Sequence, residues 1–129
     1  MRESNIMESK NSSSLNEQAF SFVFAFNGIR KFIFRERNAR WHLLATIIVA
    51  GASIYFKVSS AEITLLIVLI GLVWIAEMFN TCIEKLIDYI SDEHLPVLGY
   101  IKDLAAGAVL VASICAFIAG LIIFIPKII

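Results

Sequence analysis

The sequence predicts an all-helical integral-membrane protein, and the prediction rests on its composition and on three long apolar segments. The chain has 129 residues, of which 59% are hydrophobic and 17% are charged. Ordinary soluble domains are about 45–50% apolar and about 25% charged, and a domain this small cannot bury so much apolar surface. The formal net charge of zero argues against nucleic-acid binding. Cys82 and Cys115 both lie in apolar segments, which excludes a disulfide scaffold.

The N-terminal part is expected to stay outside the bilayer core. Residues 1–14 are polar and predict a disordered tail. Residues 15–40 combine six phenylalanines with five basic residues, a mixture typical of a helix lying among lipid headgroups. Four of the phenylalanines alternate with a period of two, which favours a strand. A lone strand cannot satisfy its backbone hydrogen bonds in lipid, so an amphipathic surface helix is predicted over about 15–40.

Three apolar segments follow, over about 41–57, 62–90 and 100–126, and each is predicted to span the membrane. A spanning helix needs about 20 predominantly apolar residues, and residues 104–126 contain no charge at all. The alternative is a soluble three-helix core, but the segments have no polar face that would cover such a core in water. Residues 15–129 are therefore expected to form one membrane domain.

Lysine and arginine predict the orientation of these spans. Seven basic residues precede the first span, whereas the 57–62 loop contains Lys57 alone. We therefore expect a cytoplasmic N-terminus, an outer 57–62 loop, an inner 84–103 loop and an outer C-terminus.

The third span carries small residues at every fourth position, a pattern that lets helices approach closely in lipid. This small-residue ridge consists of Ala108, Ala112, Ala116 and Gly120. Packing within one chain and self-association explain it equally well.

The second span ends in an acidic stripe, which consists of the polar residues Glu77, Asn80, Glu84 and Asp88. At about 100° per residue, these four positions share one helical face about 80° wide. Ionisable residues at a membrane edge are rare and usually functional. His42 and His94 are isolated, and we expect polar loop or interface residues there rather than metal ligands.

Lys102 and Asp103 are expected to open the third helix, where an aspartate in the first turn is favoured by the helix dipole. They would bring a cation close to the acidic stripe. Hard carboxylate oxygens suit Mg²⁺, an ammonium group suits phosphate, and a further carboxylate can act as a base. The competing interpretation is a small ion or proton conductor. It is disfavoured because the carboxylates cluster at one membrane edge and no polar residue continues the path across.

The residue pattern resembles the prokaryotic diacylglycerol kinase family. The chain reads Glu77-Met-Phe-Asn80-Thr-Cys-Ile-Glu84-Lys-Leu-Ile-Asp88 and then Lys102-Asp103-Leu-Ala-Ala-Gly107-Ala-Val-Leu, against a family signature E-x-x-N-[ST]-A-I-E-x-x-x-D and K-D-x-x-A-G-A-V-L. A further element, Glu36-Arg37-Asn38-Ala39-Arg40-Trp41-His42, is similar to the E-R-N-x-R-x-H sequence of the family.

The resemblance implies a small membrane lipid kinase that uses Mg²⁺ and ATP. The implied architecture is a surface helix and three spans, assembled as a homotrimer with shared active sites in the bacterial inner membrane. By motif, Glu77 matches the catalytic base, and Glu84 and Glu36 match the metal carboxylates. The residues implied on the nucleotide side are Asn80, Glu84, Asp88, Glu93, Lys102 and Asp103.

The chain also departs from the family pattern. Cys82 replaces the usual alanine, and a basic residue common near the start of the surface helix is missing. The loop Glu93-His94-Leu95-Pro96 does not align its histidine with the family, so His94 is given no role. The lipid acceptor implied is diacylglycerol or undecaprenol, and the Glu36–His42 element is more similar to the undecaprenol branch.

Overall fold

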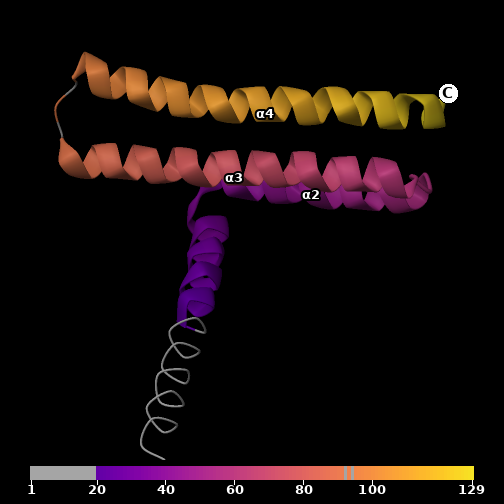
Figure 1. Cartoon of the computed structure of the whole chain (residues 1–129), viewed down its shortest axis with the longest axis horizontal. Coiled ribbons are helices and arrows are strands. Elements are labelled where there is room, and N and C mark those ends of the chain that lie inside the picture. The colour runs from indigo at the N-terminus through magenta and orange to yellow at the C-terminus, as the bar shows by residue number, and fades with distance from the viewer. Residues whose placement is uncertain (1–19, 92, 94) are drawn as a thin grey trace, which may run out of the picture. The chain divides into compact units, whose positions relative to one another are not determined.

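The computed structural model describes residues 20–91, 93 and 95–129. All regular structure in these residues is helical, with no strand, which confirms the all-helical prediction. A helix over 20–35 is followed by α2 (Arg37–Tyr55), α3 (Ser60–Ile90) and α4 (Pro96–Ile128) (Figure 1). The tail expected over 1–14 and the residue His94 lie outside the described residues.

The N-terminal residues, up to Arg37, form a unit of their own. Its helix covers 20–35, so the alternating phenylalanines are helical and the strand alternative is wrong. The helix does not continue to residue 40 as expected. Glu36 is not helical, although its N–H still donates to the carbonyl of Phe32 at 3.0 Å, and α2 begins directly afterwards. No glycine or proline stands at this break, so the sequence carries no signal for it.

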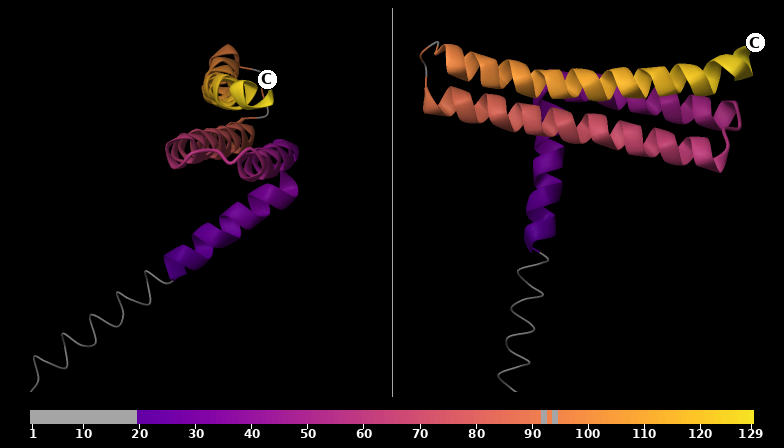
Figure 2. Two further views of the ribbon diagram at one scale, coloured as in Figure 1. Left: turned by 90° about the vertical axis from the view of Figure 1, so that its right-hand side faces the viewer. Right: turned by 45° about the horizontal axis from the view of Figure 1, so that its top comes forward.

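Helices α2, α3 and α4 form the second unit, in which successive helices run in opposite directions (Figures 1 and 2). A short turn joins α2 to α3, and Lys57 adopts a left-handed conformation there with φ 50°. The start of α3 is fixed by a capping box. The N–H of Glu62 is paired with the side chain of Ser59, and the Glu62 carboxylate accepts from the Ser59 N–H at 2.8 Å.

The connection from α3 to α4 is shorter than the sequence pattern predicts. The third helix was expected to begin near residue 100, with Asp103 in its first turn. It begins instead at Pro96, whose fixed φ suits the first position of a helix. Asp103 therefore lies two turns inside α4, and the helix dipole does not explain its presence.

Helices α3 and α4 are each long and apolar enough to cross a membrane. With 31 residues at about 1.5 Å per residue, α3 is about 46 Å long, whereas the hydrocarbon core is about 30 Å thick. About a third of α3 can therefore extend beyond the core. Large apolar side chains face outward along both helices, with Ile67 65% and Ile122 69% exposed. Such a surface suits lipid, and the protein is a membrane protein.

A small apolar core joins α3 and α4 at the end of the bundle away from the acidic stripe. Val58, Leu66 and Ile123 are buried together there, with Phe56 and Phe124 packed against them. The Lys127 ammonium group also contacts the Glu62 carboxylate at 3.0 Å. These contacts fix the register of α4 on α3, and so determine which side chains meet at the opposite end.

Candidate active site

Glu77 is a buried carboxylate on α3, with only 3% of the residue exposed. Its Oε2 atom lies 3.9 Å from Nε2 of His42, which comes from α2. Because α2 begins at Arg37, only five residues before His42, most of the α3 segment from Met78 to Ile90 continues past the start of α2. The acidic stripe therefore begins between helices and continues along the free end of α3.

The inward face of α2 positions His42 beside Glu77. Ala39 is fully buried in the first turn, and His42 and Thr46 follow it at helical spacing. The Thr46 hydroxyl donates to the carbonyl of His42 at 2.7 Å and accepts from Nε1 of Trp74 at 3.1 Å. Trp74 lies one turn before Glu77 on α3, so this pair of hydrogen bonds links the backbone of α2 to α3 next to the His42–Glu77 contact.

Asn80 lies one turn beyond Glu77 and is 6% exposed. Its Nδ2 donates to Oε1 of Glu84 at 3.1 Å. A carboxylate offers only acceptors, so the amide nitrogen must face Glu84. The Asn80 Oδ1 atom then points elsewhere, and it is buried without a hydrogen-bond partner among the described residues. A buried acceptor without a donor is unusual in proteins and calls for an explanation.

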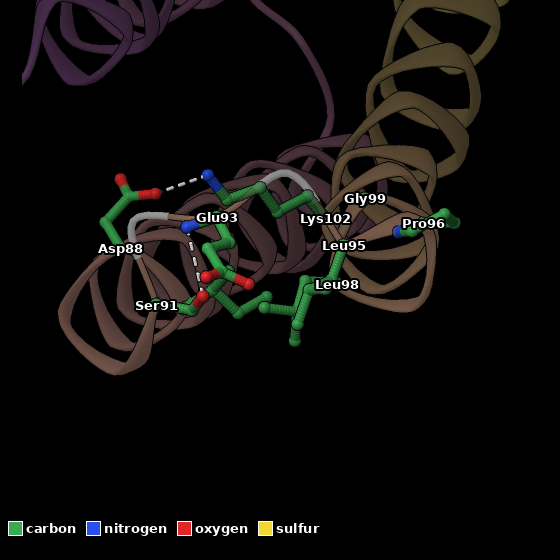
Figure 3. Close-up of a pocket in the computed structure, with 9 residues that line it drawn as sticks. Asp88, Ser91, Glu93, Leu95, Pro96, Leu98, Gly99 and Lys102 are labelled. Carbon is green, nitrogen blue, oxygen red and sulfur yellow. Dashed lines mark hydrogen bonds and ion pairs between the residues drawn. The ribbon is translucent and has the colours of Figure 1, made fainter.

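Asp88 and Lys102 meet across the α3–α4 connection, with Nζ of Lys102 2.5 Å from Oδ1 of Asp88 (Figure 3). Both line a cavity of about 500 Å³, together with Glu93 and the first turn of α4. The Glu93 N–H donates to the Ser91 hydroxyl at 3.1 Å. The cavity thus brings a cation and two carboxylates to the end of α3, as the sequence predicts for Lys102.

The structure separates the expected site residues by burial. Glu77 and Asn80 are buried, Glu84 is half-buried and Asp88 is exposed. Asp103 is exposed and does not line the cavity of Asp88 and Lys102. Among the described residues, no group of three His, Cys, Asp or Glu side chains is placed to hold a metal ion. Glu36, expected as a metal ligand, belongs to the N-terminal unit.

The sequence did not predict that His42 belongs to the site. Its spacing from Glu77 in the chain carries no signal, because the two residues come from different helices. The only indication was its position at the end of the Glu36–His42 element.

The comparison with known proteins decides what kind of protein contains this site. The sequence model of one family, described as prokaryotic diacylglycerol kinase, matches residues 23–124, which is most of the chain. The chain belongs to the prokaryotic diacylglycerol kinase family. The chain is accordingly a lipid kinase.

Individual relatives agree with this assignment. The lipid kinase is 38% identical to the undecaprenol kinase of Bacillus subtilis over 122 residues, covering 94% of this chain and 99% of the relative. It is 33% identical to the diacylglycerol kinase of a Synechocystis species, covering 82% of this chain and 61% of the relative. It is 30% identical to the diacylglycerol kinase of Escherichia coli, covering 78% of this chain and 82% of the relative.

The exposure of the Asp88–Lys102 pair gives a testable prediction for this lipid kinase. The two side chains are 65% and 36% exposed, and exposed ion pairs contribute only about 0–1 kcal/mol to stability. We expect a double-mutant cycle of Asp88→Asn and Lys102→Met to give a coupling free energy below about 1 kcal/mol. Unfolding of the four proteins in one detergent measures it. A coupling of about 3 kcal/mol would instead identify the pair as a structural link between α3 and α4.

Proposed function

We propose that this lipid kinase transfers the γ-phosphoryl group of Mg-ATP to the hydroxyl of a membrane lipid alcohol, with undecaprenol as its preferred acceptor. The observation that carries the proposal is the burial of the Glu77 carboxylate between α2 and α3, at the base of an acidic stripe that leads to a charged cavity. The acidic stripe then serves phosphoryl transfer rather than ion conduction. The similarity to an undecaprenol kinase over 94% of this chain supports the choice of acceptor.

Glu77 is the proposed general base. It is the carboxylate of α3 that lies deepest in the bundle, where the hydroxyl of a membrane lipid would arrive. Its Oε atoms would accept the hydroxyl proton while the lipid oxygen forms the new bond to phosphorus. The remaining work of phosphoryl transfer is positioning and charge neutralisation.

The chemistry of Asn80 and Glu84 fits a magnesium site. The unpaired Oδ1 of Asn80 and the carboxylate of Glu84 are both hard oxygen donors, and a cation would satisfy the buried acceptor. The family resemblance also implies Glu36 as a metal carboxylate. When bound, magnesium would neutralise charge on the phosphates of the nucleotide.

The nucleotide phosphates would lie toward the cavity at the end of α3. Lys102 offers an ammonium group there, and Asp88 holds that group in place through their ion pair. Glu93 lines the same cavity, and Asp103 lies next to Lys102 on α4. Carboxylates so close to phosphate favour a nucleotide that arrives with its metal ion.

The proposed setting is the bacterial inner membrane, with α2 as a third spanning helix. The helix over 20–35 would lie among the headgroups, and its exposed Arg30, Lys31 and Arg35 suit an anionic surface. The basic residues before α2 support a cytoplasmic N-terminus and an outer C-terminus. The active site would then face cytoplasmic ATP.

A homotrimer with shared sites is the proposed assembly. An apolar groove of about 860 Å³ runs between α3 and α4, and Ala108 and Ala112 of the small-residue ridge line it. A methyl group added to the neighbouring Gly107 would meet no atom within 4 Å. The ridge therefore has room on this side for a helix of a second copy, which supports the self-association alternative.

The acceptor specificity tests the proposed function directly. We expect labelled ATP to yield labelled undecaprenyl phosphate with kcat/KM about tenfold or more above that for diacylglycerol, in the same mixed micelles, since a site shaped for one lipid discriminates by about this factor. Thin-layer chromatography of the products measures both rates. Faster labelling of diacylglycerol would contradict the choice of acceptor, and labelling of neither lipid would contradict the function.

We expect Glu77→Gln to abolish detectable turnover, which means a loss of about 10²-fold or more. ATP binding should change little, because a base contacts only the acceptor hydroxyl. Turnover and equilibrium binding of Mg-ATP are measured on the same preparation. Loss of both would place Glu77 among the metal ligands instead.

We expect Glu84→Gln and Glu36→Gln each to raise the Mg²⁺ concentration required for half-maximal rate, since each removes one hard oxygen donor. Rates measured over a magnesium titration at fixed ATP give this value. A magnesium requirement unchanged in Glu36→Gln would show that the N-terminal unit contributes no ligand.

We expect Ala112→Leu to dissociate the oligomer in mild detergent and to lower activity with it, because it adds bulk inside the α3–α4 groove. Cross-linking at increasing detergent dilution measures the oligomer. Ala106→Leu is the matched control, since Ala106 is exposed on α4 outside the groove. If Ala112→Leu leaves a stable and active oligomer, the ridge does not form the contact between copies.

A further inference from the structure

We infer that His42 carries the proton away from Glu77 after each turnover, and so acts as a positioning and proton-exit residue of this kinase. The inference rests on the proposed role of Glu77 as the base. It concerns the contact between α2 and α3, which the proposed phosphoryl transfer does not itself use.

A buried base needs a route by which it is regenerated. Each phosphorylation leaves one proton on Glu77, and the next acceptor cannot be deprotonated until that proton has left. The Glu77 side chain is only 4% exposed, so direct exchange with water is restricted. The His42 side chain is 24% exposed. The proposed route for the proton therefore leaves the buried carboxylate through the more exposed imidazole.

The geometry allows this transfer after a small movement. The distance of 3.9 Å between Nε2 of His42 and Oε2 of Glu77 is too long for a hydrogen bond, which needs about 2.7–3.2 Å. Catalytic hydrogen bonds are often long before substrate binds and tighten in the working complex. His42 is a basic side chain that approaches the Glu77 carboxylate from the neighbouring helix.

The surroundings hold His42 in place for this task. The hydrogen bonds from Trp74 to Thr46 and from Thr46 to the carbonyl of His42 fix the backbone of α2 against α3. Arg40, two residues earlier, is exposed, and a charged side chain there suits the polar edge of the membrane in the proposed orientation. In the proposed orientation, the imidazole would release the proton toward cytoplasmic water.

Each turnover moves one proton from the lipid hydroxyl to water. The lipid O–H bond breaks as the O–P bond forms and the bond from phosphorus to the ADP oxygen breaks, and the proton moves to Glu77. Neutral His42, protonated on Nδ1, then accepts that proton on Nε2. It loses one proton to water and returns to the neutral form, while the Glu77 carboxylate is ready for the next acceptor.

The test is chemical rescue of His42→Ala in the full-length protein in mixed micelles. We expect kcat to fall about 10- to 100-fold, within the range of proton-transfer contributions, while KM for ATP stays within about twofold. Added imidazole should restore at least a tenth of the lost rate, because it can accept the proton in the space left by the side chain. Pyrrole, a ring of similar size without a basic nitrogen, should restore none.

Two further variants separate proton transfer from packing. Thr46→Val removes the hydrogen bond from Trp74 on α3 and the one to the His42 carbonyl within α2 but keeps the imidazole, so its loss of rate should be smaller and insensitive to imidazole. His42→Gln keeps a polar side chain that cannot take up a proton, and it should be as slow as His42→Ala even if the alanine variant folds poorly. Wild-type rates in His42→Gln, or equal effects of imidazole and pyrrole on His42→Ala, would overturn the inference.

Glu77→Gln separates failure of this inference from failure of the proposed function. An inactive Glu77→Gln, unresponsive to imidazole, together with fully active histidine variants would overturn the proton exit alone. An active Glu77→Gln would overturn the base itself.

Discussion

The register between α3 and α4 is the constraint on which the rest of the structure depends. At one end, Leu66 and Ile123 are buried together and Lys127 contacts Glu62. At the other end, the same register brings Lys102 to Asp88. Because each helix is rigid over more than 30 residues, contacts at one end determine which charges meet at the other end. A shift by one turn would move Lys102 about 5 Å away from its partner.

The four residues of the acidic stripe on α3 differ in burial and therefore lie in different chemical environments. Glu77 and Asn80 are buried, whereas Asp88 is exposed. Membrane proteins retain buried ionisable groups mainly where function requires them, because leaving them in lipid is costly. The end of α3 is therefore suited to charged, water-borne ligands, and the region around Glu77 to a group that arrives from the bilayer.

The contact between His42 and Glu77 shows how a short helix can complete a site carried by a longer one. Helix α2 begins only five residues before the His42–Glu77 contact, and its first turns provide one imidazole and the hydrogen bonds next to it. A lipid kinase must exclude water from the reacting oxygen and still release a proton in every cycle. In the proposed mechanism, a partly exposed histidine beside a buried carboxylate would satisfy both demands.

Composition and the long apolar segments predicted that the chain is helical and membrane-bound, and helical periodicity placed Glu77, Asn80, Glu84 and Asp88 on one face, because these inferences depend only on residues along the chain. The approach of Lys102 to the acidic stripe was also predictable, since a short connection must join the two helix ends. The helix boundaries at Glu36 and Pro96 were misplaced, because no strong breaker marks the first and a proline can begin a helix as well as end one.

Only the tertiary structure decided which residues meet across helices. The contact of His42 with Glu77, the link from Trp74 to Thr46 and the unpaired oxygen of Asn80 all depend on the rotation and register of one helix against another. The sequence determines the apolar and polar faces of each helix. In this chain, apolar residues surround most of each helix, so many rotations are nearly equal in hydrophobic burial. The choice among them rests on a few polar contacts between residues far apart in the chain, which no local pattern encodes.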